Sequence, residues 1–262
     1  MLAMRYIKRL INFIICAGVM YVAPVSADQT LPDVVQKVKP SIVGVGIYNI
    51  MGRPKAKFRG TGFIVGNGKY VITNSHVVPE LVEKDAKGYL AVFTQEKGLQ
   101  KVRRAEKIAR DIDHDLYLLR ITGDPLPALE LGDSSQVREG ELYAFTGFPI
   151  GTVLGMYPAT HRGIISAITP IVTPADSSYD LKQKAIRRLR SPYDVFQLDA
   201  TAYPGNSGSP LYDPGTGEVV GVVNKVFVKE TKEDALENPS GITYAIPVLY
   251  VHRLIKNAGL AF

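Results

Sequence analysis

The chain has 262 residues, of which 46% are hydrophobic and 21% charged, and its formal net charge is +6. These values exclude a disordered tail, a collagen-like repeat and a polytopic membrane protein, while 24 glycines and 17 prolines favour a turn-rich fold of short strands. The only cysteine is Cys16, which excludes an intramolecular disulfide framework and a cysteine-based zinc cluster.

Residues 1–27 have the composition of an export signal. Arg5, Lys8 and Arg9 precede an apolar stretch, and the small residues that a signal peptidase reads follow at 25–27. The stretch of about 14 apolar residues is shorter than the ~20 that a membrane span requires, so a retained signal anchor is the less favoured alternative. Cleavage near Ala27-Asp28 predicts a periplasmic or secreted protein that meets the membrane only transiently, through its signal peptide.

Cleavage of the signal also changes the charge of the chain. Loss of its three basic side chains lowers the formal net charge from +6 to +3. Because a net charge of +3 does not indicate a basic surface for binding nucleic acid, we expect no nucleic-acid partner. Cys16 is removed with the signal, so the mature protein is expected to contain no cysteine.

The rest of the chain predicts short β-strands in two groups. The first group comprises residues 41–48, 61–65, 70–73, 89–94, 102–109 and 116–121. After a proline-containing link at 123–127, the second group comprises 142–147, 163–172, 195–198, 219–228 and 242–246. A helix is predicted only at 247–257, where apolar residues recur at helical spacing. Regular short strands separated by turns predict an all-β sandwich or barrel.

The segment Gly205-Asn206-Ser207-Gly208-Ser209-Pro210 is the most informative motif. A serine between glycines on a tight turn exposes its hydroxyl and aligns backbone N–H groups beside it. Acyl transfer requires these two features, a nucleophile and donors for the developing oxyanion. Because serine alone is a weak nucleophile, a base must also be present.

Two further residues complete a candidate catalytic triad. His76 follows an apolar strand, and its imidazole can take and return the serine proton. Asp115 opens the apolar strand at 116–121, where a charge is rarely placed without a partner, and can orient the imidazole. Each residue alone has an ordinary structural interpretation, but their combination in the order His, Asp, Ser is far more specific. The remaining histidines, His114, His161 and His252, are interpreted as structural.

These motifs resemble those of the chymotrypsin-fold (trypsin-like) serine proteases, and among them the bacterial HtrA/Deg envelope proteases. The similar segments are 40–44, 60–65, 73–78, 113–116, 131–135, 147–151, 163–166, 198–210 and 244–247. The expected absence of cysteine from the mature chain favours the HtrA/Deg branch over the secreted digestive proteases of the same fold, which are cross-linked by several disulfides.

The resemblance implies an all-β fold of two six-stranded antiparallel barrels with a short C-terminal helix. Residues 1–27 would be the signal peptide, 28–125 the barrel that carries the histidine and aspartate, and 126–262 the barrel that carries the serine. His76 would be the general base, Asp115 its orienter and Ser207 the nucleophile, and the N–H groups of Gly205 and Ser207 would form the oxyanion hole.

The implied function is an exported serine endopeptidase in envelope protein quality control or processing. Its partners would be protein or peptide substrates, unfolded chains among them, and the resemblance leaves a homo-oligomer open. No cofactor and no metal are expected.

Three departures from the family pattern limit what carries over. The chain ends at Phe262, which leaves no room for the PDZ domain that usually follows the protease, so PDZ-gated activation is not expected. Ser209 replaces the second glycine of the commoner motif. Asn206 carries no charge, so it cannot form the buried ion pair by which digestive relatives are activated, and Ile42 is interpreted as an ordinary strand residue.

Substrate specificity has a fainter signal. By position in this fold, Thr201, Ala202 and Val226 would line the S1 pocket, which receives the side chain before the scissile bond. None is charged, which favours a small or medium apolar residue there. A basic insertion at 173–194 corresponds by position to a regulatory loop of the family, and a solvated loop is the favoured interpretation.

Two alternatives remain open at this point. A catalytically silent chaperone or binding module would keep these motifs but hold the oxyanion loop collapsed. A non-peptidase hydrolase such as an esterase is less favoured, since it usually has an α/β fold and the chain order Ser, Asp, His.

Overall fold

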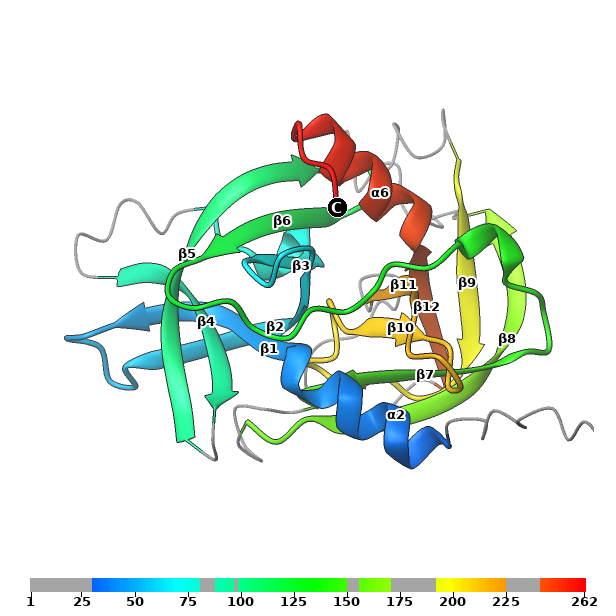
Figure 1. Ribbon diagram of the computed structural model, residues 1–262, viewed down its shortest axis with the longest axis horizontal. Helices are drawn as coiled ribbons and strands as arrows, with labels where there is room; N and C mark the ends of the chain where they lie inside the picture. Colours follow the sequence, from blue (N-terminus) through cyan, green and yellow to red (C-terminus); the bar gives the residue numbers. More distant parts are fainter. Residues whose placement is uncertain (1–29, 81–87, 97–98, 150–155, 171–191, 225–240) are drawn as a thin grey trace, which may run out of the picture.

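A computed structural model describes residues 30–80, 88–96, 99–149, 156–170, 192–224 and 241–262. Its strands form two closed barrels of six strands each, and every pairing within the barrels is antiparallel. Figure 1 shows the barrels side by side, with the C-terminal helix α6 (Val248–Asn257) lying between them. These findings confirm the predicted all-β fold of two six-stranded barrels with a short C-terminal helix.

The first barrel has the strand order β1-β2-β3-β6-β5-β4. Its strands are β1 (Ile42–Asn49), β2 (Ala56–Val65), β3 (Tyr70–Asn74), β4 (Gly88–Glu96), β5 (Leu99–Asp111) and β6 (Leu116–Ile121). The predicted hairpin joins β2 to β3, and the positive φ angles of Gly66 and Gly68, 62° and 82°, explain the glycines of its turn.

The second barrel has the strand order β10-β11-β12-β9-β8-β7. Its strands are β7 (Leu142–Gly147), β8 (Ala159–Pro170), β9 (Asp194–Asp199), β10 (Pro210–Tyr212), β11 (Val219–Asn224) and β12 (Ile242–Pro247). All six residues of β11 are buried, and a run of β-branched side chains suits such a two-sided burial. The link between the barrels pairs with both of them, through the bridges Val65–Leu129 and Leu131–Val219.

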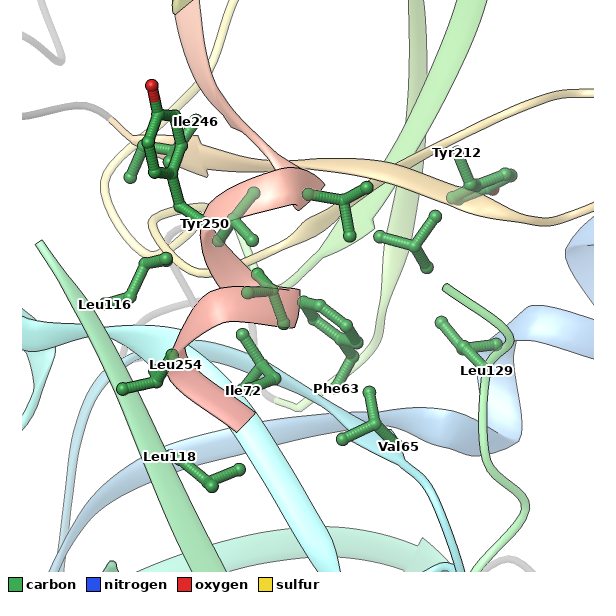
Figure 2. Close-up of a cluster of buried hydrophobic side chains, with 14 of the residues drawn as sticks. Phe63, Val65, Ile72, Leu116, Leu118, Leu129, Tyr212, Ile246, Tyr250 and Leu254 are labelled. Carbon is green, nitrogen blue, oxygen red and sulfur yellow. The ribbon is translucent and has the colours of Figure 1, made fainter. Parts of the chain in front are cut away.

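One hydrophobic cluster connects the two barrels. Helix α6 follows the last strand of the second barrel, yet its buried Val251, Leu254 and Ile255 share this cluster with Leu116 and Leu118 of the first barrel. Figure 2 shows Leu254 among the strand residues of the first barrel, with Tyr212 and Ile246 contributed by the second. Burial of these side chains stabilises the contact by about 1.5–3 kcal/mol each, which fixes one barrel against the other.

Two elements were not predicted. Helix α2 (Leu31–Val38) precedes the first barrel and buries Val34 and Val38, although residues 247–257 were expected to form the only helix. Thr30 and Asp33 form a capping box at its start, a signal that lies only three residues beyond the expected signal cleavage. Strand β10 has three residues and begins with a proline, so its sequence does not look like a strand.

Several predictions lie outside the described residues. These are the signal peptide at 1–27, the basic insertion up to residue 191, Val226, and the end of the strand expected at 219–228. Across the described part of the chain, no helix is long and apolar enough to cross a membrane. The domain boundary after residue 125 stays a prediction.

Candidate active site

His76 and Asp115 form two direct hydrogen bonds. The His76 Nδ1 atom lies 2.7 Å from Asp115 Oδ2, and the backbone N–H of His76 donates to Asp115 Oδ1 at 3.0 Å. Asp115 is 1% exposed, whereas the His76 side chain is 31% exposed. Because an ionised carboxylate only accepts hydrogen bonds, this contact places the imidazole proton on Nδ1 and leaves the Nε2 lone pair free for a second partner.

A third donor reaches the Asp115 carboxylate from the second barrel. The side-chain amide of Asn224, the last residue of β11, donates to Asp115 Oδ2 at 2.9 Å, and Asn224 is completely buried. Asn224 is not among the site residues predicted from the sequence. A polar residue at the end of the otherwise apolar run 219–223 was the available signal, since a buried amide needs a partner.

The backbone around Asp115 fixes its orientation. Asp115 has a φ angle of 54°, which is unusual for a residue other than glycine, and such strain persists only where neighbours hold it. Its carbonyl accepts from the N–H of Ser75 at 2.8 Å and from the Asn74 side chain at 3.3 Å. Since Ser75 and His76 share one 3₁₀ turn, η2 (Ser75–Val77), these bonds hold the imidazole and the carboxylate together.

Thr61 of β2 holds the loop that carries Ser207. Its N–H donates to the Ser207 carbonyl at 2.9 Å, and its hydroxyl donates to the Gly205 carbonyl at 2.7 Å. The same hydroxyl accepts from the Phe148 N–H at 3.1 Å. The first barrel thereby fixes the serine loop of the second, a role for Thr61 that the sequence analysis missed.

Gly60 shows how closely the histidine turn approaches the serine loop. A Cβ atom at Gly60 would lie 2.6 Å from Val77 Cγ2 and 3.0 Å from the Ser207 carbonyl oxygen. Val77 is the neighbour of His76 in η2, so the histidine turn and the serine loop flank the same point of β2. The structure therefore brings the turn that carries His76 and the loop that carries Ser207 to the same point of β2.

The backbone donors of the serine loop fall into two groups. The N–H groups of Asn206, Gly208 and Ser209 donate to backbone carbonyls at 2.9–3.0 Å. Those of Gly205 and Ser207 have no acceptor among the residues that the structure describes. Positive φ angles at Gly205 (102°) and Gly208 (89°) produce this tight loop. Two unused donors beside a serine hydroxyl can stabilise an oxyanion.

Of the three residues predicted to line the S1 pocket, the structure describes Thr201 and Ala202. Ala202 is 5% exposed and packs in the core of the second barrel, and Thr201 is half-buried beside it. Val226, the third residue expected in the S1 pocket, lies outside the described residues. Within the described ranges, no group of three or more His, Cys, Asp or Glu side chains is placed to hold a metal ion.

The other histidines occupy three different environments. His161 stacks on Phe145 with ring centroids 5.0 Å apart, and burial lowers its pKa. The Nε2 atom of His252 lies 3.1 Å from the Gly132 carbonyl oxygen at an exposed position. His114 precedes Asp115 and forms a second His–Asp pair, with Asp111.

Comparison with known proteins places this site in a family. Residues 60–222 match the trypsin-like peptidase domain, and this segment includes His76, Asp115 and Ser207. A probable periplasmic serine endoprotease DegP-like from Halomonas elongata is 31% identical over 72% of this chain and 32% of its own length. Human serine protease HTRA4 is 32% identical over 82% of this chain and 38% of its own length. The chain thus spans about a third of the length of these curated relatives.

Solved structures agree with the observed fold. The HtrA-type protease AlgW with a decapeptide superposes with a TM-score of 0.61 at 22% identity, covering 88% of this chain and 67% of that one. A serine endoprotease from Yersinia pestis gives 0.61 at 23% identity, over 88% and 66% of the two chains. The match over 60–222 and the two barrels together confirm the resemblance found in the motifs: the chain belongs to the trypsin-like peptidase family and is similar to its HtrA/DegP members.

Proposed function

We propose that the protein is an exported serine endopeptidase that hydrolyses peptide bonds of protein substrates through Ser207, His76 and Asp115. The observation that carries this proposal is the junction between the barrels. There His76 Nδ1 lies 2.7 Å from Asp115 Oδ2, and the turn that carries His76 lies beside the serine loop. In this loop the N–H groups of Gly205 and Ser207 have no acceptor among the residues that the structure describes. Membership of the trypsin-like peptidase family supports the same chemistry.

The first half of the reaction would form an acyl-enzyme. The Ser207 hydroxyl attacks the substrate carbonyl carbon while His76 Nε2 takes its proton. The carbonyl oxygen becomes an oxyanion that accepts from the N–H groups of Gly205 and Ser207. The intermediate then expels the amine, which receives the proton from His76, and the acyl group remains on Ser207.

The second half would return the enzyme to its starting state. A water molecule attacks the ester carbonyl and loses its proton to His76 Nε2. The intermediate releases the carboxylic acid product, and Ser207 recovers its proton from His76. Throughout both halves, Asp115 keeps the imidazole in one tautomer and stabilises its charged form, with Asn224 holding the carboxylate.

Substrate class and location belong to the same proposal. The uncharged Thr201 and Ala202 support a small or medium apolar side chain before the scissile bond. The signal-like residues 1–27 and the Halomonas relative, which is named periplasmic, support action in the cell envelope. A peptide library varied at that position tests the specificity, and preferred cleavage after Lys, Arg or Glu would refute it.

Covalent labelling tests the catalytic proposal directly. Purified protein and its Ser207→Ala variant are incubated with a fluorophosphonate probe and, separately, with casein. We expect wild-type protein to be labelled and to degrade casein, and the variant to do neither. Wild-type protein that is folded by circular dichroism, yet remains unlabelled and inactive, would favour the silent module with a collapsed oxyanion loop.

A further inference from the structure

The turn before Asp115 contains a second His–Asp pair. His114 Nδ1 lies 2.6 Å from Asp111 Oδ2, and Asp111 Oδ1 accepts the N–H groups of Asp113 at 3.1 Å and His114 at 3.0 Å. Burial alone would raise the pKa of Asp111, but the hydrogen bonds and electrostatic attraction from His114 outweigh burial and lower it. Asp111 therefore stays ionised and anchors both the backbone and the ring of His114.

The His114 ring is also held from the second barrel. It stacks on Tyr250 of α6 with centroids 3.8 Å apart and rings inclined by 19°, and it meets Tyr193 edge-on at 4.6 Å. Tyr193 and Tyr250 contact each other at 5.2 Å, and both are buried. The ring of His114 thus lies between two tyrosines, one from the segment just before β9 and the other from helix α6. We call these four residues, Asp111, His114, Tyr193 and Tyr250, the His114 clamp.

The clamp is attached to the catalytic carboxylate by a single peptide bond. Asp115 follows His114 in the chain and has the strained φ angle of 54°. On the other side of Asp115, its carbonyl is fixed by the Ser75 N–H at 2.8 Å. With the ring of His114 held on one side and the carbonyl of Asp115 on the other, rotation of the backbone at Asp115 is prevented. That rotation would move the carboxylate away from His76.

We infer that His114 is a positioning residue of the catalytic site: its ring, held by Asp111 and by Tyr193 and Tyr250, keeps Asp115 in the strained conformation in which it bonds His76. The inference rests on the proposed function, because it assigns His114 a role toward that site. A displacement of about 1 Å in a catalytic group can cost ~100-fold in rate, so the clamp is expected to affect turnover rather than substrate binding.

The test compares three variants with one control. His114→Phe keeps a stacked ring but loses the bond to Asp111, His114→Ala loses both contacts, and Tyr250→Leu removes the stack from the side of α6. The control is His252→Ala, which removes an exposed histidine whose Nε2 atom lies 3.1 Å from the Gly132 carbonyl oxygen. Thermal unfolding is recorded for each protein, and activity is measured well below the lowest unfolding temperature.

Two readouts separate positioning from simple stabilisation. The first is peptide hydrolysis together with the rate of fluorophosphonate labelling. We expect kcat and the labelling rate to fall about tenfold or more in His114→Ala and less in His114→Phe, with KM unchanged. The second is the proton NMR signal of the His76 Nδ1–H, recorded in a Ser207→Ala background. We expect this signal to broaden or disappear in the clamp variants and to persist in His252→Ala.

The outcomes are distinguishable from failure of the proposed function. Folded variants that keep the wild-type kcat and the His76 signal, whatever their loss of thermal stability, would overturn the inference. An unlabelled wild-type protein would overturn the proposed function instead, and the NMR comparison would still decide whether His114 orients the pair. If His114→Ala does not fold, His114→Phe and Tyr250→Leu carry the same test.

Discussion

The side-chain amide of Asn224 donates to the carboxylate of Asp115 across the interface between the barrels, at 2.9 Å. Asn224 ends strand β11 of the second barrel, and Asp115 immediately precedes β6 of the first. Both side chains are buried, at 0% and 1% exposure. The bond therefore ties the carboxylate that contacts His76 to the barrel that carries Ser207, and it adds to the contacts of Thr61 with the serine loop.

Removal of this amide should weaken catalysis more than binding. In Asn224→Ala the Asp115 carboxylate loses a donor in a place that water does not reach, a change worth about 1–3 kcal/mol. Since about 1.4 kcal/mol corresponds to a factor of ten in rate, we expect kcat to fall about tenfold or more, with little change in KM. Steady-state hydrolysis of a peptide checks this, and Asn67→Ala in the exposed β2–β3 turn is the control. An unchanged kcat would show that the Asn224 amide is not needed to hold the carboxylate.

Substitution of Asn224 by aspartate has a different expected result. Asn224→Asp has nearly the same shape but places a second carboxylate against Asp115, and two like charges so close cannot both stay ionised. We expect loss of fluorophosphonate labelling at neutral pH and a lower free energy of unfolding. Labelling at the wild-type rate would contradict a close contact between residues 224 and 115.

Gly205 and Gly140 make a matched pair of glycines for testing the oxyanion loop. Both have positive φ angles, 102° and 87°. A Cβ at Gly205 would collide with the Phe148 carbonyl, whereas one at Gly140 would meet nothing within 4 Å. We expect Gly205→Ala to lower the labelling rate about 100-fold or more, because the loop must rearrange. Gly140→Ala should stay active and lose only ~1–2 kcal/mol of stability to backbone strain. Equal activity of the two variants would refute the assigned loop geometry.

The fold and the catalytic candidates were predictable because their signals are local. Short apolar and β-branched runs bounded by turn signals predicted eleven of the strands, within a few residues at the ends that the structure describes. Family motifs pointed to His76, Asp115 and Ser207 as one site. Pro210–Tyr212 was missed because three residues that begin with proline carry no strand pattern. Leu31–Val38 was missed because its capping box stands next to the expected signal cleavage.

The contacts that support the site were not predictable from spacing. Asn224 lies 109 residues from Asp115 in the sequence, and Thr61 lies 144 residues from Gly205. Their partners are set by how the barrels dock, which depends on the packing of α6 against both. His114 looked like a structural residue, and only the folded chain brings Tyr193 and Tyr250 to its ring. Long-range polar contacts of this kind leave no periodic signal in one sequence.

The uncharged Asn206, next to Ser207, predicts that the protein does not use a buried ion pair with a released amino terminus. The Asn206 side chain is completely buried, and neither side-chain polar atom has a hydrogen-bond partner among the residues that the structure describes. Ile42 opens β1 and pairs with Phe63, so it occupies an ordinary strand position, as predicted. Asn206→Asp would therefore bury a carboxylate without a cation.

We expect Asn206→Asp to lower the free energy of unfolding by several kcal/mol at pH 7, on the order of 3–5. Urea denaturation measures the change. Asn67→Asp at an exposed turn provides the control and should shift stability by less than about 0.5 kcal/mol. A variant as stable as the wild type would mean that a cationic group reaches residue 206, and sequencing of the mature amino terminus would identify it.

His161 should make stability depend on pH near neutrality. Burial lowers its pKa below the ordinary value of 6.5, and its buried Nε2 atom has no hydrogen-bond partner in the described part of the chain. The unfolded chain therefore binds a proton at this position more readily than the folded protein. As the pH falls through 6.5, the unfolded state gains protons first, so this group's contribution to stability decreases until the pH reaches the folded-state pKa.

The prediction is a difference between two stability curves. The free energy of unfolding is measured by urea denaturation from about pH 8 to pH 5 for the wild type and for His161→Leu. Because leucine cannot titrate, the variant should gain stability relative to the wild type as the pH falls. His252→Leu, at an exposed helix position, controls for the loss of a histidine and should not reproduce this divergence. Parallel curves for wild type and His161→Leu would show that the imidazole binds its proton equally well in the folded and unfolded chains.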